Sequence, residues 1–381
     1  MRRNIMLVVA VLMSVSLLWI STAAAEQPAD APQDPDKQVC MDENDPAYNA
    51  TMASHKLMKN GQQALLIGKY DIAIREFRAA LKRLPENDDA RMQLAWTLTQ
   101  AGKPREAVKE LEVLKAKRPN WTALHLAYGT AYAAAGDEAP ARDHFEVVFA
   151  SEPDEMRHWL FYAEAMERFG PAKAAAVLED AMGKKKDWHP VGAEAGRLYY
   201  RSGDYAKALA LLMPACENLT EHEGLLMPLI VSIHATADHA AMLAQLKTKA
   251  DGAGTAWCKA AYGGVLYMDG KAAEAKPYIL DAVKTGKNNA AALYFKGRLL
   301  LDDGKIIEGA ETLSGVTSGD PSKNLDILYM TGKALEAVPN QDLSIGAYKA
   351  FINLAARRSV MADKRKAAEI RIKELEAATS I

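Results

Sequence analysis

Glycine recurs at a fixed interval along much of the chain, and this interval constrains the possible fold more than any other feature. Three glycines and three prolines repeat every 34 residues: Gly68, Gly102 and Gly136, and Pro85, Pro119 and Pro153. Small residues hold the positions seven before and five after each glycine: Gly61, Ala95, Gly129, Ala73, Ala107 and Ala141. A fixed period of this length indicates stacked helix pairs, because a single unit cannot bury its apolar face without neighbours.

One repeat unit shows why this spacing makes two helices. Before Gly68, small or apolar residues recur every three or four positions, which is the pattern of one helical face. Gly68 can adopt the positive φ that ends a helix. From Tyr70 onward apolar residues again recur with helical spacing, and Pro85 then stops the second helix. The small side chains at Gly61 and Ala73 let the two helix axes approach closely.

This unit resembles the tetratricopeptide repeat. Two sequence motifs and the proline after them carry the likeness: Gly68-Lys69-Tyr70-Asp71-Ile72-Ala73-Ile74, Arg78-Ala79-Ala80-Leu81 and Pro85. The resemblance implies an all-α fold in which antiparallel helix pairs stack into a right-handed superhelical solenoid. It also implies a concave groove, lined by the first helix of each pair, in which such arrays bind peptides or proteins.

The same period continues toward the C-terminus with small changes. Further turn glycines stand at Gly170, Gly203, Gly270 and Gly304. One more unit fits into the long interval before Gly270, with its turn expected at Thr236, and a last unit is expected to turn at Val338-Pro339-Asn340. We therefore predict about nine helix pairs, two of them degenerate, and the resemblance covers the chain from about residue 51 to residue 358.

Two prolines in the middle of the chain predict a division of the array. Pro214 falls late in one predicted helix and Pro228 inside the next, and each is expected to remove a backbone donor and kink its helix. The predicted segments are a regular array at 51–216, a degenerate repeat that acts as a hinge at 217–255, a second array at 256–358 and a capping helix at 359–381. We expect the cap to turn Ile370 and Leu375 toward the core and its charged side toward water.

Residues 1–25 have the three parts of a secretory signal peptide. Arg2 and Arg3 precede an apolar run over residues 5–20, and Ala23 and Ala25 occupy the small-residue positions before a cleavage site. An uncleaved membrane anchor is the alternative, but the run is shorter than the roughly 20 residues of a spanning helix and no stop-transfer charges follow it. We expect cleavage after Ala25 and a periplasmic protein without a stable membrane span.

An acidic, proline-rich stretch follows at residues 26–50. Its few apolar residues predict a disordered spacer with no buried face. The whole chain carries 47 basic and 49 acidic side chains, a formal net charge of −2, and removal of the two signal-peptide arginines would make it −4. A mildly acidic chain lacks the basic surface that nucleic-acid binding requires, so we predict no nucleic-acid partner.

Motifs for catalysis are absent from the sequence. It contains no P-loop, H-E-x-x-H, G-x-S-x-G or C-x-x-C motif, so we predict no catalytic residues, no cofactor and no metal site. His234 and His239 are five residues apart and are expected on different helical faces. Cys216 and Cys258 flank a whole helix pair, a separation that favours two buried thiols over a disulfide, while the state of Cys40 stays open.

Residues on the predicted first helices are the candidates for partner binding. By their helical positions these are Met92, Trp96, Leu126, Phe161, Glu164, Arg197, Tyr200 and Arg201. Aromatic and arginine side chains dominate binding hot spots. Each of these side chains has the alternative role of packing the array itself.

Taken with the resemblance, these features predict a non-catalytic scaffold or adaptor in the bacterial periplasm that binds a protein or peptide segment in the concave groove. The alternative is an accessory or regulatory subunit of an envelope secretion, pilus or polysaccharide synthesis and export machine, because a fold alone does not separate the two. The convex face and the acidic tail stay open as other binding surfaces. An unrecognised catalytic site is disfavoured by the missing motifs.

Overall fold

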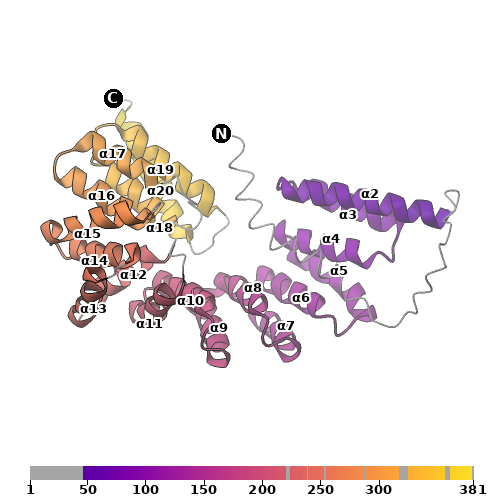
Figure 1. The fold of residues 1–381 in the computed structure, drawn as a ribbon. Coiled ribbons are helices and arrows are strands. Elements are labelled where there is room, and N and C mark those ends of the chain that lie inside the picture. The colour runs from indigo at the N-terminus through magenta and orange to yellow at the C-terminus, as the bar shows by residue number, and fades with distance from the viewer. Residues whose placement is uncertain are drawn as a thin grey trace, which may run out of the picture. The chain divides into compact units, whose positions relative to one another are not determined.

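The computed structural model describes residues 46–219, 224–237, 239–252, 255–286, 289–316, 325–356 and 361–379, and every regular element in these ranges is a helix (Figure 1). The predicted signal peptide, most of the predicted spacer and Cys40 lie outside the described residues. The prediction of an all-α repeat fold is confirmed. Within the described ranges, no helix combines the length and the apolar character that a membrane crossing requires.

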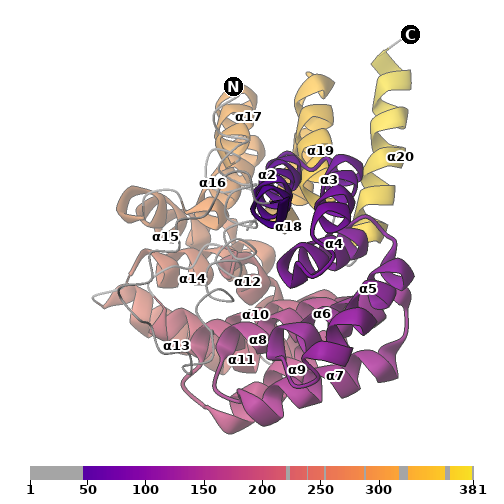
Figure 2. The same ribbon diagram turned by 90° about the vertical axis from the view of Figure 1, so that its right-hand side faces the viewer.

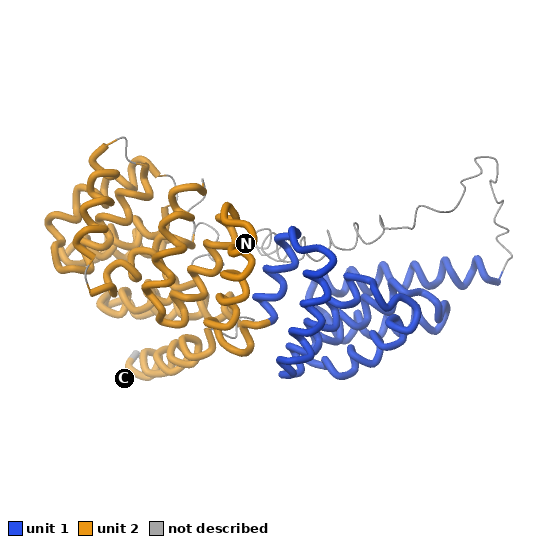
Figure 3. Tube along the Cα trace, turned by 90° about the horizontal axis from the view of Figure 1, so that it is seen from below, with its two compact units in different colours: residues 1–165 blue, residues 166–381 orange. Residues whose placement is uncertain are grey.

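The chain divides into two compact units, Met1–Ala165 and Met166–Ile381 (Figure 3). The helices of unit 1 are α2 (Pro46–Leu66), α3 (Tyr70–Arg83), α4 (Asp88–Gln100), α5 (Pro104–Lys117), α6 (Thr122–Ala135), α7 (Glu138–Ser151) and α8 (Met156–Met166), which ends at the boundary. Consecutive helices from α2 to α7 pack against one another, and α4 also contacts α6 (Figures 1 and 2). Unit 1 is therefore a row of stacked helix pairs.

Unit 2 also consists of consecutive helices. Its helices are η1 (Glu167–Phe169), α9 (Pro171–Lys184), α10 (His189–Ser202), α11 (Tyr205–Asn218), α12 (Leu226–Ala235), α13 (Ala240–Asp251), α14 (Ala256–Met268), α15 (Ala272–Thr285), α16 (Ala290–Asp302), α17 (Ile306–Gly315), α18 (Leu325–Leu335), α19 (Gln341–Ala355) and α20 (Ala362–Thr379). In chain order, the helices from α2 to α19 make nine pairs, which confirms the predicted number.

The periodic small residues occupy the positions where helices meet. Gly68, like the other predicted turn glycines, has a positive φ, here 70°. A Cβ atom on Gly61 would lie 2.7 Å from the ring of Phe77, and one on Gly129 would lie 2.6 Å from the ring of Phe145. The first helix of such a pair therefore carries a glycine at the position where the second helix places a large aromatic side chain.

The core of unit 1 lies along the interfaces between these pairs. Its fully buried side chains include Phe77, Leu94, Leu98, Leu111 and Leu124. Each such side chain contributes about 1.5–3 kcal/mol relative to an exposed position. The interfaces between pairs thus supply the stability that one pair lacks by itself.

The two prolines differ in their effect. Pro214 lies inside α11, as predicted, where its ring removes one backbone hydrogen bond. Pro228 is the third residue of α12, so the prediction that it interrupts a helix is wrong. The first turn of a helix has no intrahelical acceptors for its N–H groups, and proline costs little there.

The segment predicted as a hinge contains two helices, α12 and α13, that pack against neighbouring helices. Helix α12 contacts α11 and α14, and Met227, Leu229 and Ile230 on α12 are buried. The two compact units meet in the sequence between Ala165 and Met166. A bend between Pro214 and Pro228 stays a prediction.

The last helix covers the end of unit 2. Helix α20 packs against α19, and Ala368, Ile372 and Leu375 join a buried cluster with Phe351. Leu375 faces the core as predicted, but Ile370 is 50% exposed, so its predicted position is wrong. Ile372 is buried in its place, because Ala368, Ile372 and Leu375 share one face of the helix and Ile370 lies on the opposite face.

Candidate functional site

The first helices of unit 1 carry five of the candidate binding residues. Met92 and Trp96 lie one turn apart on α4, and both are partly buried. Met92 packs against the core cluster of unit 1. The indole N–H of Trp96 donates no hydrogen bond to any described residue. Trp96 therefore offers an aromatic face and a free donor in the middle of α4.

The other candidates in unit 1 differ in their exposure. Leu126 on α6 is only 5% exposed, so it packs within the array and offers no surface to a partner. On α8, Phe161 is partly buried and Glu164 is exposed. We call Met92, Trp96, Phe161 and Glu164 the first-helix face of unit 1, since these are the candidates there that water reaches.

The three candidates of unit 2 meet the C-terminal helices of their own unit. Arg197 and Arg201 on α10 line a small cavity together with Met227 of α12 and with Asp326 and Ile327 of α18. The cavity has room of about 10 Å³, near the minimum that one water molecule needs. This part of α10 is therefore covered by the chain itself.

Charges around this cavity are arranged in pairs. Arg197 Nη1 lies 2.9 Å from Glu194 Oε2, and the Lys364 ammonium donates to the carboxylate of Asp326. Arg201 lines the same cavity, and burial lowers the pKa of its guanidinium, as does the neighbouring Arg197. Its Nη1 atom is buried without a hydrogen-bond partner among the described residues.

Tyr200 completes the cluster on α10. The Lys364 Nζ atom lies 6.0 Å from the ring centre of Tyr200 and 6.0 Å from that of Tyr329. Burial raises the pKa of the Tyr200 hydroxyl, and the charge of Asp326 raises it further. Sequence reasoning did not identify Asp326 or Lys364. The available signal was one acidic residue inside the apolar run from Leu325 to Leu328, because a buried carboxylate needs a partner.

Two histidines that were expected apart come together in the structure. His234 Nδ1 lies 2.7 Å from Asp269 Oδ1, and His239 Nε2 lies 2.9 Å from Asp269 Oδ2. The expectation that they lie on different helical faces is wrong, because α12 ends at Ala235 and His239 lies beyond the turn. The carboxylate thus ties the turn between α12 and α13 to the end of α14. Within the part of the chain that is described, no group of three or more His, Cys, Asp or Glu is arranged to hold a metal ion.

The two described cysteines are separate thiols. Cys216 and Cys258 are both buried, and neither is in a disulfide bond. Burial raises the pKa of the Cys216 thiol to about 12 and also raises that of Cys258. Both thiols are therefore unreactive at neutral pH.

Comparison with known proteins agrees with the geometry of the repeats. The model of a family described as tetratricopeptide repeat matches residues 41–187. No curated protein matches the chain. Among solved structures, the chain is similar to a tetratricopeptide repeat protein from Parabacteroides merdae, at 11% identity over 75% of this chain and 98% of that one, with a TM-score of 0.38.

Two other solved structures show similar values. PilF from Pseudomonas aeruginosa is 15% identical over 65% of this chain and 98% of its own, with a TM-score of 0.37. The tetratricopeptide repeat domain of P58(IPK) is 18% identical over 85% of this chain and 99% of its own, with a TM-score of 0.25. The assignment rests on the family match and on the helix pairs that keep the same period up to α19. Residues 41–187 of this chain match the tetratricopeptide repeat family.

Proposed function

We propose that this protein is a non-catalytic adaptor that binds a segment of a protein partner on the first-helix face of unit 1. The observation that carries the proposal is Trp96, which is partly exposed beside Met92 and keeps an unpaired indole N–H. Tryptophan is strongly enriched in binding hot spots, because it joins a large apolar area to one hydrogen-bond donor. Proteins of this repeat family bind protein or peptide partners, which supports the same conclusion.

The proposed location is the bacterial periplasm. Its support is the sequence of residues 1–25, with Arg2 and Arg3 before an apolar run and small residues at Ala23 and Ala25. The intact mass of the protein recovered from a periplasmic extract tests this proposal. A chain that begins at Glu26 is the expected result, and a membrane-bound chain that still begins at Met1 would contradict it.

Site-specific photocrosslinking in living cells tests the binding surface. A photoreactive amino acid replaces Trp96 in one variant and Val147 in a control variant. Val147 is 45% exposed on α7, the second helix of its pair. Adducts at position 96 and none at position 147 are expected, and the reverse pattern would place recognition outside the first-helix face. The identity of the captured protein also separates a free adaptor from an accessory subunit of an envelope machine.

The affinity for the captured partner then measures how much Trp96 contributes to the free energy of binding. The change Trp96→Ala is expected to weaken binding by at least about 2 kcal/mol, which is roughly 30-fold in Kd. The matched control is Trp121→Ala, since Trp121 is also partly buried but caps the start of α6. Melting curves of both variants show whether the array stays folded. If both variants lose affinity equally, the loss comes from reduced stability of the fold and not from a lost contact between Trp96 and the partner.

A further inference from the structure

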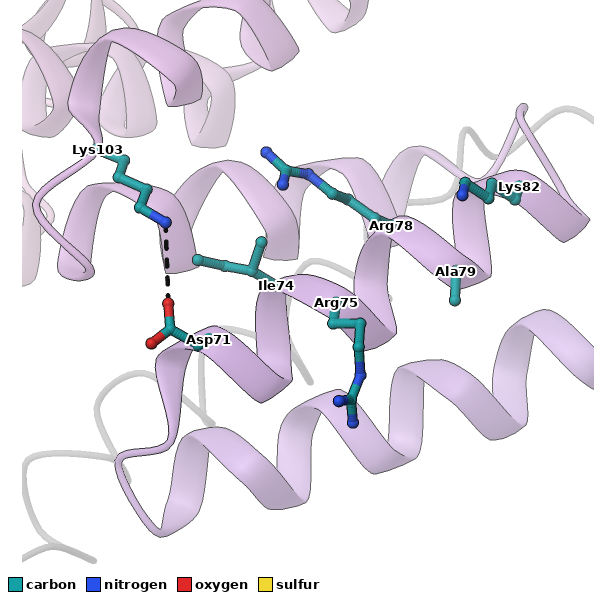
Figure 4. A pocket seen from close by; sticks show the side chains of 7 residues that line it. All are labelled: Asp71, Ile74, Arg75, Arg78, Ala79, Lys82 and Lys103. Atoms are coloured by element: carbon teal, nitrogen blue, oxygen red, sulfur yellow. Dashed lines mark ion pairs between the residues drawn. The ribbon is translucent and has the colours of Figure 1, made fainter.

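A shallow recess lies on α3, a second helix of unit 1. Figure 4 shows Arg75, Arg78 and Lys82 in succession along α3, and Lys103 reaching over to Asp71 from the start of α5. These side chains, with Ile74 and Ala79, surround about 400 Å³ of space. Four of the seven lining residues are cations and one is an acid. We call these seven residues the α3 recess.

The paired cations of the α3 recess have exposed or partly exposed partners; Arg75, itself largely exposed, lies 3.0 Å from Oε1 of its sequence neighbour Glu76. The Lys103 Nζ atom lies 3.8 Å from Asp71 Oδ1, and the Asp71 side chain is 94% exposed. Arg78 and Glu106 are 2.7 Å apart, with both side chains about half exposed. Lys82 has no ion pair with any described residue. Exposed ion pairs contribute about 0–1 kcal/mol to stability. These cations can therefore leave their present partners and pair with another carboxylate.

Charge is separated along the first part of the chain. Residues 46–118, which form α2 to α5, carry 14 basic and 8 acidic side chains, a net charge of +6. Residues 26–45, which precede α2 directly, carry seven acidic side chains and one lysine, a net charge of −6. The two charges are equal and opposite, and the two segments are covalently joined.

Chain length lets the acidic segment reach the recess. Helices α2 and α3 form an antiparallel pair, and α2 is the longer by seven residues, with 21 against 14. The start of α2 therefore extends about 10 Å past the end of α3. Twenty residues span up to about 66 Å when extended, whereas α3 is about 21 Å long. The covalent link also gives the segment a high effective concentration at the recess.

We propose that the acidic segment 26–45 of the same chain docks on the α3 recess, where its carboxylates pair with Arg75, Arg78, Lys82 and Lys103. This contact is independent of partner binding on the first-helix face. It covers the basic surface of the α3 recess with the chain's own acidic residues. An acidic segment of another protein would have to displace it. The contact is electrostatic, so it weakens as salt shortens the screening length from about 10 Å at 0.1 M to about 3 Å at 1 M.

Carbodiimide crosslinking tests the contact, because this reagent joins a carboxylate to a lysine amine only where the two touch. In the purified chain at low salt, mass spectrometry is expected to find Lys82 or Lys103 joined to an acidic residue of the segment 26–45. At 1 M salt these products are expected to fall by at least about fivefold. A mixture of isotope-labelled and unlabelled protein shows whether each product lies within one chain.

Two variants make the test specific. The double variant Arg75→Glu/Arg78→Glu reverses the charge at two positions of the α3 recess but keeps Lys82 and Lys103, which form the crosslinks. It is expected to lower the yield of crosslinked products by roughly fivefold or more. The matched control Arg142→Glu changes an exposed arginine on α7 and is expected to leave the yield unchanged. Circular dichroism confirms that the variants fold. The proposal is overturned if the products are absent at low salt, form only between copies, or persist in the reversed variant.

Discussion

Phe77 on α3 packs directly on the backbone of Gly61 on α2, so closely that a Cβ atom at position 61 would lie 2.7 Å from its ring. Phe77 is itself fully buried and belongs to the core cluster of unit 1. The same relationship recurs between Gly332 and Tyr348 in unit 2, again at 2.7 Å. The 34-residue period in the sequence thus reflects one packing contact that recurs between the two helices of a pair.

The first prediction follows from this contact. Gly61→Ala is expected to destabilise unit 1 by about 1–3 kcal/mol, because the added methyl group forces the Phe77 ring to move. The control is Gly183→Ala on α9, where a Cβ atom would meet nothing within 4 Å. Alanine favours a helix over glycine by up to about 1 kcal/mol, so the control is expected to be neutral or stabilising. Urea denaturation measures both, and equal stability of the two variants would refute the packing argument.

The second prediction concerns pH. His144 Nδ1 lies 2.9 Å from His125 Nδ1, and His125 Nε2 lies 2.8 Å from the carbonyl oxygen of Pro119. His125 therefore donates to Pro119 and accepts from His144. Burial lowers the pKa of His144 to about 4, with a further contribution from His125.

The sign of the pH effect follows from that pKa. The unfolded chain binds a proton at His144 near pH 6.5, whereas the folded chain does so only near pH 4. Stability is thus fully present above pH 6.5 and is lost as the pH falls toward 4. His144→Gln is expected to reduce this loss between pH 7 and pH 4.5 by roughly 1–2 kcal/mol. Denaturation curves across this range check it, and an unchanged pH slope would show that His144 titrates normally.

The third prediction concerns the carboxylate that joins two histidines. The hydrogen bond that His239 donates to the carboxylate of Asp269 is the largest cause that raises the pKa of His239. Stability from this bond is present below the ordinary histidine pKa and is lost as the pH rises through the raised value. Asp269→Asn is therefore expected to cost more stability at pH 6 than at pH 8, and to return the pKa of His239 toward 6.5. Titration of the histidine ring signals by NMR measures the shift.

The fourth prediction concerns the pair that joins α18 to α20. Asp326 is buried, and Lys364 is its ion-pair partner. Lys364→Met leaves the carboxylate buried without its cation and is expected to cost about 1–2 kcal/mol, less than for a fully buried pair because Lys364 is partly exposed. Lys349→Met is the matched control, since its pair with Glu376 also joins two C-terminal helices but both side chains are about half exposed.

A double variant separates charge from packing in that pair. Lys364→Met/Asp326→Asn removes both charges and is expected to recover part of the lost stability. Thermal melting of the three variants completes the comparison. If the single and double variants lose stability equally, the role of Lys364 is to pack against Tyr200 and Tyr329.

The candidate site shows how far helical position predicts accessibility. Met92 and Leu126 hold equivalent places on α4 and α6, 34 residues apart, and both were expected on the binding surface. The structure leaves Met92 partly exposed but buries Leu126. Their difference depends on which side chains the neighbouring helices supply, and the repeat pattern does not contain that information.

The amino-acid sequence by itself determined the all-α fold, the nine helix pairs and the turn at Gly68, because helix periodicity, positive φ and close packing are properties of residues near one another in the chain. Only the tertiary structure decided that Lys364 meets Asp326 and Tyr200, and that Asp269 joins two histidines. These contacts join residues that are 30 to 164 positions apart in the sequence. A local pattern cannot specify them, since they depend on the small rotations that add up as successive helix pairs stack.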